Sequence, residues 1–421
     1  MNLSSDTVSS LSRTCRHLRA ITLPELYRLV HIRNHKADSF SSALTRNPSF
    51  ADYVISLTIY YHTENESDDD PQFLYAEALT PIITRLPRLQ TLIIKGTNFR
   101  DRYQYDIDTL GIDNLNISVR ASLLEAAKEQ RRESAGFQEA FQRTPKGAVL
   151  GSLRTCELNF SDRAPWDLSK RSAIFLHPTL KSLTIVGGYM EDFSLLDKNK
   201  ARTFSTVLQE LTFLSSHLTP LALREVLSLP KALQKFTLKG FGGQLPHHTH
   251  PERKGVMDAL EQQRQSLRGL ELSFPFPSSD VNSPVNLRAF ANLEDVAISP
   301  RLLELGDGDG AGMGGQVSPP KQSPFPGSVR RLHFLDPHRQ FIWAEGDRVY
   351  LSVIARWVKD GELPNLKSVA FTSLDGRFPE NVGGVLTGTK VAIQRMEPKV
   401  NWFGDIECWC CRVGTGASLR F

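Results

Sequence analysis

A six-residue apolar phrase, LxxLxL, recurs ten times along the 421-residue chain. In each copy an apolar residue is followed by a second one three positions later and by a third two positions after that. The last two residues predict a β-strand, because alternate side chains of a strand point to the same face. The sequence therefore predicts a series of short strands that share one buried face.

Five copies carry mostly leucine: Leu89-Leu92-Ile94, Leu180-Leu183-Ile185, Leu208-Leu211-Phe213, Leu233-Phe236-Leu238 and Leu267-Leu270-Leu272. Five looser copies carry other apolar residues: Val54-Leu57-Ile59, Leu153-Cys156-Leu158, Leu293-Val296-Ile298, Val329-Leu332-Phe334 and Leu366-Val369-Phe371. Their middle residues lie 25 to 37 positions apart, except for one interval of 64 between Leu92 and Cys156.

Regular leucine-rich repeats span about 20 to 29 residues, so the shorter intervals fit this class and the longer ones require inserted loops or helices. We therefore expect an α/β fold, an irregular leucine-rich-repeat solenoid with parallel strands on its concave side and helices and loops on its convex side. A solenoid can exceed the roughly 250 to 300 residues at which a single core stops growing, because each repeat packs only on its neighbours.

The expected organisation has three parts: a helical cap at 1–50, the solenoid at 51–372 and a C-terminal capping segment at 373–421, where about two strands pair along the edge of the last repeat. Good helix formers with mixed charge predict an inserted helical segment at about 110–143. Ile112-Leu115-Ile117 in that segment is alternatively a degenerate repeat. Dense glycine and proline predict a flexible loop at 306–327.

Several segments between the strands show helical patterns. Convex-side helices are expected at Phe73–Leu86, Leu221–Leu229, Val256–Leu267 and Tyr350–Val358, with Thr219 as N-cap and Pro220 at the first helical position of the second one. At the N-terminus an amphipathic helix is expected over 7–21, followed by Pro24. A further short helix around Phe40–Leu44 should be stopped by Asn47-Pro48.

The composition limits where the protein acts and what it binds. Lys and Arg number 50 against 46 Asp and Glu, a net charge of +4, which is too small to indicate binding to nucleic acid or an anionic membrane. No apolar run reaches the roughly 18 to 20 residues of a membrane span. Five cysteines, an odd number, are typical of a reducing compartment. We expect a cytoplasmic or nuclear protein.

The words SSLSRTCRHLRAITLPELYRLVHI and FSSALTRNPSFADYVISLTI resemble the latter half of an F-box and its downstream junction in fungal F-box proteins with leucine-rich repeats. The segment FLHPTLKSLTI resembles the same proteins. The resemblance implies that N-terminal helices dock on a Skp-type adaptor linked to a cullin, while the repeats hold a protein substrate for ubiquitin transfer. It assigns adaptor docking to seven residues: Val8, Leu11, Cys15, Arg16, Leu18, Arg19 and Ile21.

The chain departs from this family at its start, where a leucine-proline-acidic turn and a first aliphatic helix are missing. Either translation begins further upstream, or the gene has lost the first helix together with much of the adaptor-binding surface. The apolar stripe of the N-terminal helix has a second interpretation, because the first repeat of a solenoid must be covered by an atypical capping element. Both roles are compatible with the same residues.

Residues at the third and fifth positions of each phrase should point outward on the concave face, the usual ligand surface of extended repeat proteins. They are mostly small or polar. Six of them can make charge-assisted contacts with a partner and are the candidate partner-binding residues: Glu210, Lys235, Glu271, Asp295, Arg331 and His333.

No catalytic signature is present: the chain lacks a HExxH pair and a GxSxG elbow, and GDGDGAGMGG lacks the lysine of a phosphate-binding loop. His247, His248 and His250 with Asp258 form a conceivable metal site, but exposed proline-flanked loops often carry histidines. Cys408, Cys410 and Cys411 lack an evident fourth zinc ligand and fit a packed cap better.

The sequence thus predicts a protein without enzymatic activity, cofactor or metal. Its expected role is substrate recognition in a Skp-cullin-F-box ubiquitin ligase. The alternative is a leucine-rich-repeat scaffold that no longer docks on an adaptor. Upstream genomic sequence would discriminate between them, because an in-frame leucine-proline-acidic helix would favour the first.

Overall fold

The structure is a computed structural model in which the chain forms two compact units. Unit 1 comprises Met1–Tyr189 and Phe193–Leu208, and unit 2 comprises Met190–Asp192 and Gln209–Phe421. The residues that it describes are 10, 15–33, 36–60, 82–95, 141, 143–144, 147–148, 150–159, 166–168, 172–190, 204–214, 216–239, 253–273, 285–303, 322–335, 352–372 and 391–396.

Unit 1 is built around parallel strands that run side by side in chain order. They are β1 (Leu29–Arg33), β2 (Ser56–Tyr60), β3 (Thr91–Lys95), β6 (Thr155–Asn159) and β8 (Ser182–Val186). Their register is in phase with the phrase: Leu57 pairs with Leu92, Leu92 with Cys156, and Cys156 with Leu183. Equivalent positions of successive phrases therefore lie opposite each other in the sheet.

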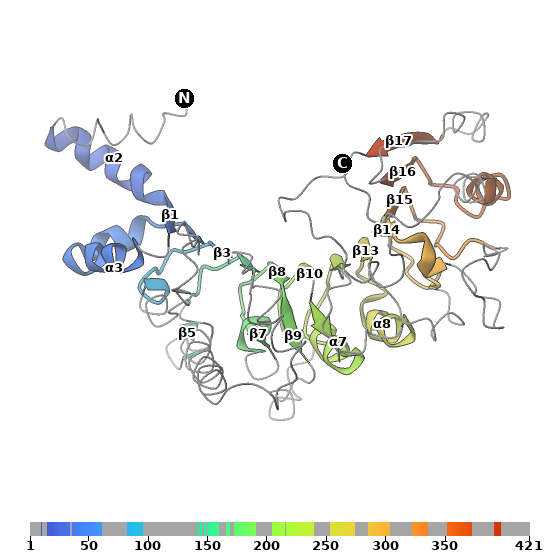
Figure 1. Cartoon of the computed structure of the whole chain (residues 1–421), viewed down its shortest axis with the longest axis horizontal. Coiled ribbons are helices and arrows are strands. Elements are labelled where there is room, and N and C mark those ends of the chain that lie inside the picture. Colours follow the sequence, from blue (N-terminus) through green and yellow to red (C-terminus); the bar gives the residue numbers. More distant parts are fainter. Residues whose placement is uncertain are drawn as a thin grey trace, which may run out of the picture. The chain divides into compact units, whose positions relative to one another are not determined.

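Unit 2 repeats this arrangement. Its parallel strands are β10 (Glu210–Leu214), β12 (Lys235–Lys239), β13 (Gly269–Ser273), β14 (Asp295–Ile298), β15 (Arg331–Leu335), β16 (Ser368–Thr372) and β17 (Ala392–Met396), again in chain order (Figure 1). The last strand, β17, pairs with β16 and extends the sheet beyond the last copy of the phrase. The prediction of parallel, phrase-built strands is confirmed in both units.

The fourth and sixth positions of the phrase form the core, as the alternation predicted. Leu92, Leu183, Leu211 and Phe236 at fourth positions are all 0% exposed, and so is the first-position residue Leu89. Complete burial of one such side chain contributes about 1.5–3 kcal/mol relative to exposure. Stacked apolar rows therefore supply most of the stability of each unit.

A backbone ladder fixes the phase of the repeats. The carbonyl oxygen of each second-position residue accepts the N–H groups of the second and third positions of the next repeat. In unit 1, Gln90 O accepts from Arg154 N at 2.8 Å and from Thr155 N at 3.0 Å. In unit 2, Gln234 O accepts from Arg268 N at 2.8 Å and from Gly269 N at 2.9 Å. The same two hydrogen bonds form between neighbouring phrases although the number of residues between the phrases differs.

Helices α7 (Pro220–Leu227) and α8 (Arg253–Leu260) of unit 2 pack against each other along one side of the strands (Figure 1). As predicted, Thr219 caps α7, because its Oγ1 accepts the Ala222 N–H at 3.2 Å, and Pro220 opens the helix. Gly255 makes the close approach possible, since a Cβ there would lie 2.5 Å from Cβ of Pro220. Residues 352–359 form another helix, near the predicted 350–358.

The N-terminal helix differs from the prediction. It is α2, Arg16–Arg28, and it continues through Pro24 instead of ending before it. The missing N–H of Pro24 removes one helical hydrogen bond, while packing of α2 against β1 and η2 (Pro48–Tyr53) supports the last turns. The second predicted helix is α3, Ala37–Arg46, and it ends at Asn47 as expected.

Strand β1 corrects the prediction of an entirely helical segment at 1–50. Leu29–Arg33 pairs in parallel with β2 in the same register as every later strand, so Tyr27, Val30 and Ile32 occupy the three apolar positions of an eleventh phrase. Tyr27 stacks on Phe50 of η2 with ring centroids 4.5 Å apart. The repeats therefore begin before Val54.

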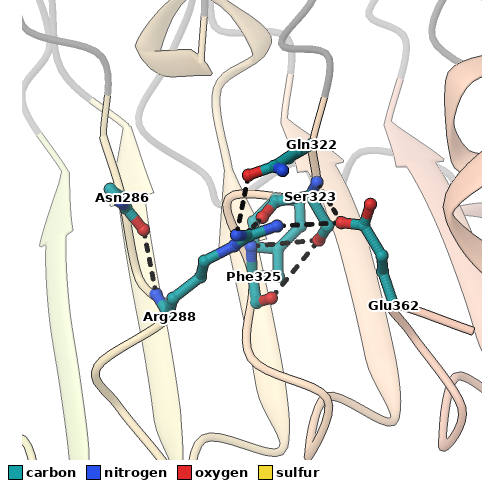
Figure 2. A network of polar contacts seen from close by, with 6 residues as sticks. All are labelled: Asn286, Arg288, Gln322, Ser323, Phe325 and Glu362. Atoms are coloured by element: carbon teal, nitrogen blue, oxygen red, sulfur yellow. Dashed lines mark hydrogen bonds and ion pairs between the residues drawn. The ribbon is translucent and has the colours of Figure 1, made fainter.

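The loop predicted at 306–327 is described only over 322–327, where residues 323–326 are buried. Ser323 is 1% and Phe325 2% exposed. Arg288 holds this segment by donating to Ser323 O at 2.5 Å, Gln322 Oε1 at 3.0 Å and Glu362 Oε2 at 2.9 Å (Figure 2). Glu362 Oε2 also accepts the Ser323 N–H at 2.6 Å. One guanidinium thus ties three consecutive repeats together.

The remaining short elements lie between the strands: β4 (Arg143–Thr144), β5 (Gly147–Ala148), β7 (Trp166–Asp167), β9 (Gly188–Met190), β11 (His217–Leu218), η4 (Ser172–Leu176), η6 (Glu261–Gln263) and η8 (Pro300–Leu303). The predicted insertion at about 110–143 lies outside the described residues apart from 141 and 143, and most of the predicted helix at 73–86 does so as well.

Candidate functional site

The candidate partner-binding residues all lie on the strands of unit 2, on the face opposite its core. Third-position residues follow one another in register, so that Glu210 pairs with Lys235 and Asp295 with Arg331, with Gly269 between them. A second row at the fifth positions holds Glu271, Ala297 and His333 on successive strands. The structure thus brings together six side chains that span more than 120 residues of sequence.

Asp295 and Arg331 form a bidentate ion pair, in which Nε and Nη2 of the guanidinium donate to the two carboxylate oxygens. Hydrogen bonding to Asp295 raises the pKa of Arg331 above its usual value. The side chain of Arg331 remains 70% exposed. This bidentate pair, called the fork below, fixes the orientation of the Arg331 guanidinium. Its Nη1 is left for hydrogen bonds to a binding partner.

A second ion pair joins Lys239 Nζ to Glu271 Oε1 at 2.5 Å. Burial lowers the pKa of His333, which is two strands away from Glu271; the Glu271 carboxylate opposes this shift and Lys239 adds to it. The imidazole is therefore neutral at pH 7 and can both donate and accept a hydrogen bond. Lys239 was not predicted as a site residue, because it lies one residue beyond the end of its phrase.

Small residues shape this face between the charges. The stem of Lys235 lies beside Gly269, where a Cβ would be 3.4 Å from Lys235 Cγ and so in ordinary van der Waals contact with it. Ala297 separates Glu271 from His333 in the fifth-position row. Small residues therefore separate the charged side chains of this face.

The corresponding face of unit 1 is different in character. Leu29 is 60% exposed, and the rings of His31 and Tyr60 stack with centroids 6.3 Å apart. Hydroxyl residues such as Thr91 and Thr155 follow on the next strands. This aromatic and aliphatic group was not predicted, although a reading of Tyr27-Val30-Ile32 as a phrase would have placed Leu29 and His31 on the outer face.

The predicted adaptor-docking residues are only partly described, because Val8 and Leu11 lie outside the described residues. The others lie at the start of α2, where the sulfur of Cys15 accepts the Leu18 N–H at 3.5 Å as an N-cap. Leu18 is half-buried, and the remaining members are exposed: Cys15, Arg16, Arg19 and Ile21.

The part of the chain that the structure describes contains neither a cluster of metal-binding side chains nor a membrane-spanning helix. No group of three or more His, Cys, Asp or Glu side chains suited to a metal ion was found there. His247, His248, His250 and the C-terminal cysteines fall outside that part, and Asp258 lies 4.0 Å from Arg224. Among the described helices, none has the length and apolar character needed to cross a bilayer.

The two described cysteines should differ sharply in reactivity. Burial raises the pKa of the Cys156 thiol, which is 1% exposed in the core, whereas Cys15 is exposed. Because only an accessible thiolate reacts, we expect a maleimide to modify Cys156 at least ~100-fold more slowly than Cys15 in the native protein. Peptide mass spectrometry measures both rates. Equal rates in a folded sample would contradict the burial of Cys156.

No protein-family model matches the chain, and no curated protein matches it. Among solved structures, the chain is similar to one described as the crystal structure of the Rad7 and Elc1 complex in yeast, with 13% sequence identity, a TM-score of 0.37, and coverage of 93% of this chain and 88% of that chain.

Proposed function

We propose that the chain is a protein-interaction module without catalytic activity of its own. It recognises a protein substrate through the outer face of its repeat strands and serves as the substrate-recognition subunit of a Skp-cullin-F-box ubiquitin ligase. The observation that carries the proposal is the in-register, preorganised row of charged side chains on unit 2, centred on the Asp295–Arg331 fork. Fixed, exposed charges favour specific encounters between proteins.

Docking on a Skp-type adaptor is assigned to α2. In support, the predicted docking residues that are described keep their side chains available at the surface; Ile21, for example, is 58% exposed. An exposed aliphatic residue beside Arg16 and Arg19 provides the mixed apolar and basic surface that the resemblance to F-box proteins implies.

A repeat scaffold without adaptor binding is the second candidate. It is favoured by the contacts of α2 with η2, because the first repeat of a solenoid needs an atypical capping element beside it. In this case Ile21 would remain exposed without a partner.

The experiment is affinity purification of the tagged full-length chain from its own cells, with mass spectrometry of the recovered proteins. We expect an adaptor of the Skp type and a cullin in stoichiometric amounts. Ile21→Asp should abolish their recovery, because it places a charge in the apolar docking surface. Leu221→Asp is the matched control, since Leu221 on α7 is similarly exposed at 54% and lies outside the docking surface.

The outcomes separate the candidates. Loss of the adaptor in Ile21→Asp but not in Leu221→Asp supports the ligase subunit. A folded wild-type chain that recovers neither adaptor nor cullin supports the scaffold. A defined chemical activity of the purified chain would contradict both.

A further inference from the structure

A charged strip runs along the edge of the unit 2 sheet where the strands begin. It consists of the residues at the second and third positions of successive phrases. The backbone ladder sets their spacing, because Arg268 O accepts from Glu294 N at 2.8 Å and Arg330 O accepts from Lys367 N at 2.8 Å. Neighbouring strands are ~4.8 Å apart, so residues distant in sequence lie in one closely spaced row.

Cations outnumber carboxylates in this strip. The three carboxylates are Glu210, Glu294 and Asp295. All five cations are exposed to solvent: Lys235, Arg268, Arg330, Arg331 and Lys367.

Two of the carboxylates already form ion pairs with arginines of the next repeat. Arg330 Nη1 lies 3.6 Å from Glu294 Oε2, and Arg331 forms its fork with Asp295. An incoming anion therefore meets two neutralised pairs rather than free carboxylates. Three cations have no ion pair with any described residue: Lys235, Arg268 and Lys367. Arg268 and Lys367 lie on either side of the two pairs, so positive charge remains on both sides of them.

The distance between these two cations indicates the form of the ligand. Arg268 and Lys367 precede β13 and β16, which are three strand spacings apart, or ~14 Å. An extended peptide advances ~3.3 Å per residue, so carboxylates four residues apart would match the two cations. Arg330 and Arg331 lie between them and can contact the peptide backbone or an intermediate carboxylate.

We propose that this strip binds an extended acidic segment of the protein partner, laid across the strands with carboxylates at Arg268 and Lys367. The proposal rests on the proposed function, because it names the chemistry of the partner bound by the same unit. The interaction is electrostatic and exposed to solvent, so it should weaken steeply with salt.

The test uses the full-length chain and a fluorescein-labelled dodecamer of glutamate, with fluorescence anisotropy at low salt. We expect the double variant Arg268→Glu/Lys367→Glu to weaken binding at least tenfold. Lys254→Glu/Lys359→Glu is the matched control, since it changes the net charge equally at exposed helical positions, and it should change the affinity less than twofold. Circular dichroism verifies that both variants fold.

The proposal fails if Arg268→Glu/Lys367→Glu binds the glutamate peptide as well as the wild type does, or if the control variant weakens binding equally. It also fails if a twelve-residue thymidine oligonucleotide binds more tightly than the peptide and is weakened as much by Arg268→Glu/Lys367→Glu. That result would assign the strip to nucleic acid. Purification of the first variant from cells keeps the two proposals apart. If the variant recovers the adaptor, the cullin and every other partner of the wild type in unchanged amounts, the strip is wrong and the proposed function stands. If glutamate binding follows the expectation but the wild type recovers no partner, the proposed function fails.

Discussion

Replacing Gln263 by leucine should lower the free energy of unfolding by about 4 kcal/mol, the largest effect that we expect from a single substitution. Gln263 is 2% exposed, and its amide links two repeats. Its Nε2 donates to Leu227 O at 2.8 Å and to Pro230 O at 3.0 Å, while its Oε1 accepts from Leu233 N at 3.0 Å. Leucine fills a similar volume but leaves three buried backbone groups without partners.

The neighbouring Gln262 provides a matched control. Its Nε2 also donates to backbone carbonyls, to Arg224 O at 2.9 Å and Ala259 O at 3.4 Å, but the first of these bonds is exposed to water. Gln262→Leu should therefore cost no more than about 1 kcal/mol. Urea unfolding followed by circular dichroism measures both variants, and hydrogen exchange should show lost protection at Leu233 only in Gln263→Leu. Equal destabilisation by the two substitutions would contradict this account.

Mild acid should destabilise unit 1 through His177. Burial lowers the pKa of His177 to about 4, and its side chain is 1% exposed. Nδ1 lies 3.4 Å from Thr179 Oγ1, which itself donates to Leu153 O at 2.7 Å, so Nδ1 is the nitrogen suited to donate. Nε2 has no hydrogen-bond partner among the described residues, and protonation would bury an unpaired charge there.

The sign of the effect follows from this shift. As the pH falls, the imidazole of the unfolded chain, with a pKa near 6.5, binds a proton at a higher pH than the folded one does. The stability that depends on a neutral His177 is therefore complete above pH 6.5 and is lost as the pH falls towards 4. The total loss is about 3 kcal/mol. Pulse labelling of Cys156 with 4,4′-dithiodipyridine, which reacts with thiols in acid, measures the unfolding of this unit as a function of urea and pH.

His177→Phe should remove this part of the pH dependence, because the aromatic ring is retained without a titrating group. The same substitution at the exposed His31 should keep the wild-type slope. A His177→Phe variant that loses stability between pH 6.5 and 4 as steeply as the wild type would show that another group is responsible.

The strands and their buried face could be predicted because they depend on alternation within one phrase, as for Leu89-Leu92-Ile94. Strand β1 was missed because Tyr27 takes the first apolar position and Pro24 suggested a helix end. The packed segment around Phe325 was missed because its composition resembles a loop, whereas Arg288 and Glu362 hold it through contacts from other repeats.

The sequence names the candidate partner-binding residues but not the contacts between them. Asp295 and Arg331 are 36 residues apart, and only the register between repeats of unequal length makes them neighbours. Lys239 and the second-position residues Arg268 and Lys367 were overlooked, because outward direction was expected only at the third and fifth positions. Pairing across strands is a tertiary property that a single phrase does not encode.

The carbonyl ladder has a consequence for how such a surface can change. Since each repeat adds one fixed step of ~4.8 Å regardless of its length, the distance between two surface charges depends on how many repeats separate them. Excising the single repeat that contains β14 would shorten the separation of Arg268 and Lys367 from ~14 to ~10 Å. Gain or loss of whole repeats can thus retune the spacing of ligand groups that this unit accepts, while insertions between strands leave that spacing untouched.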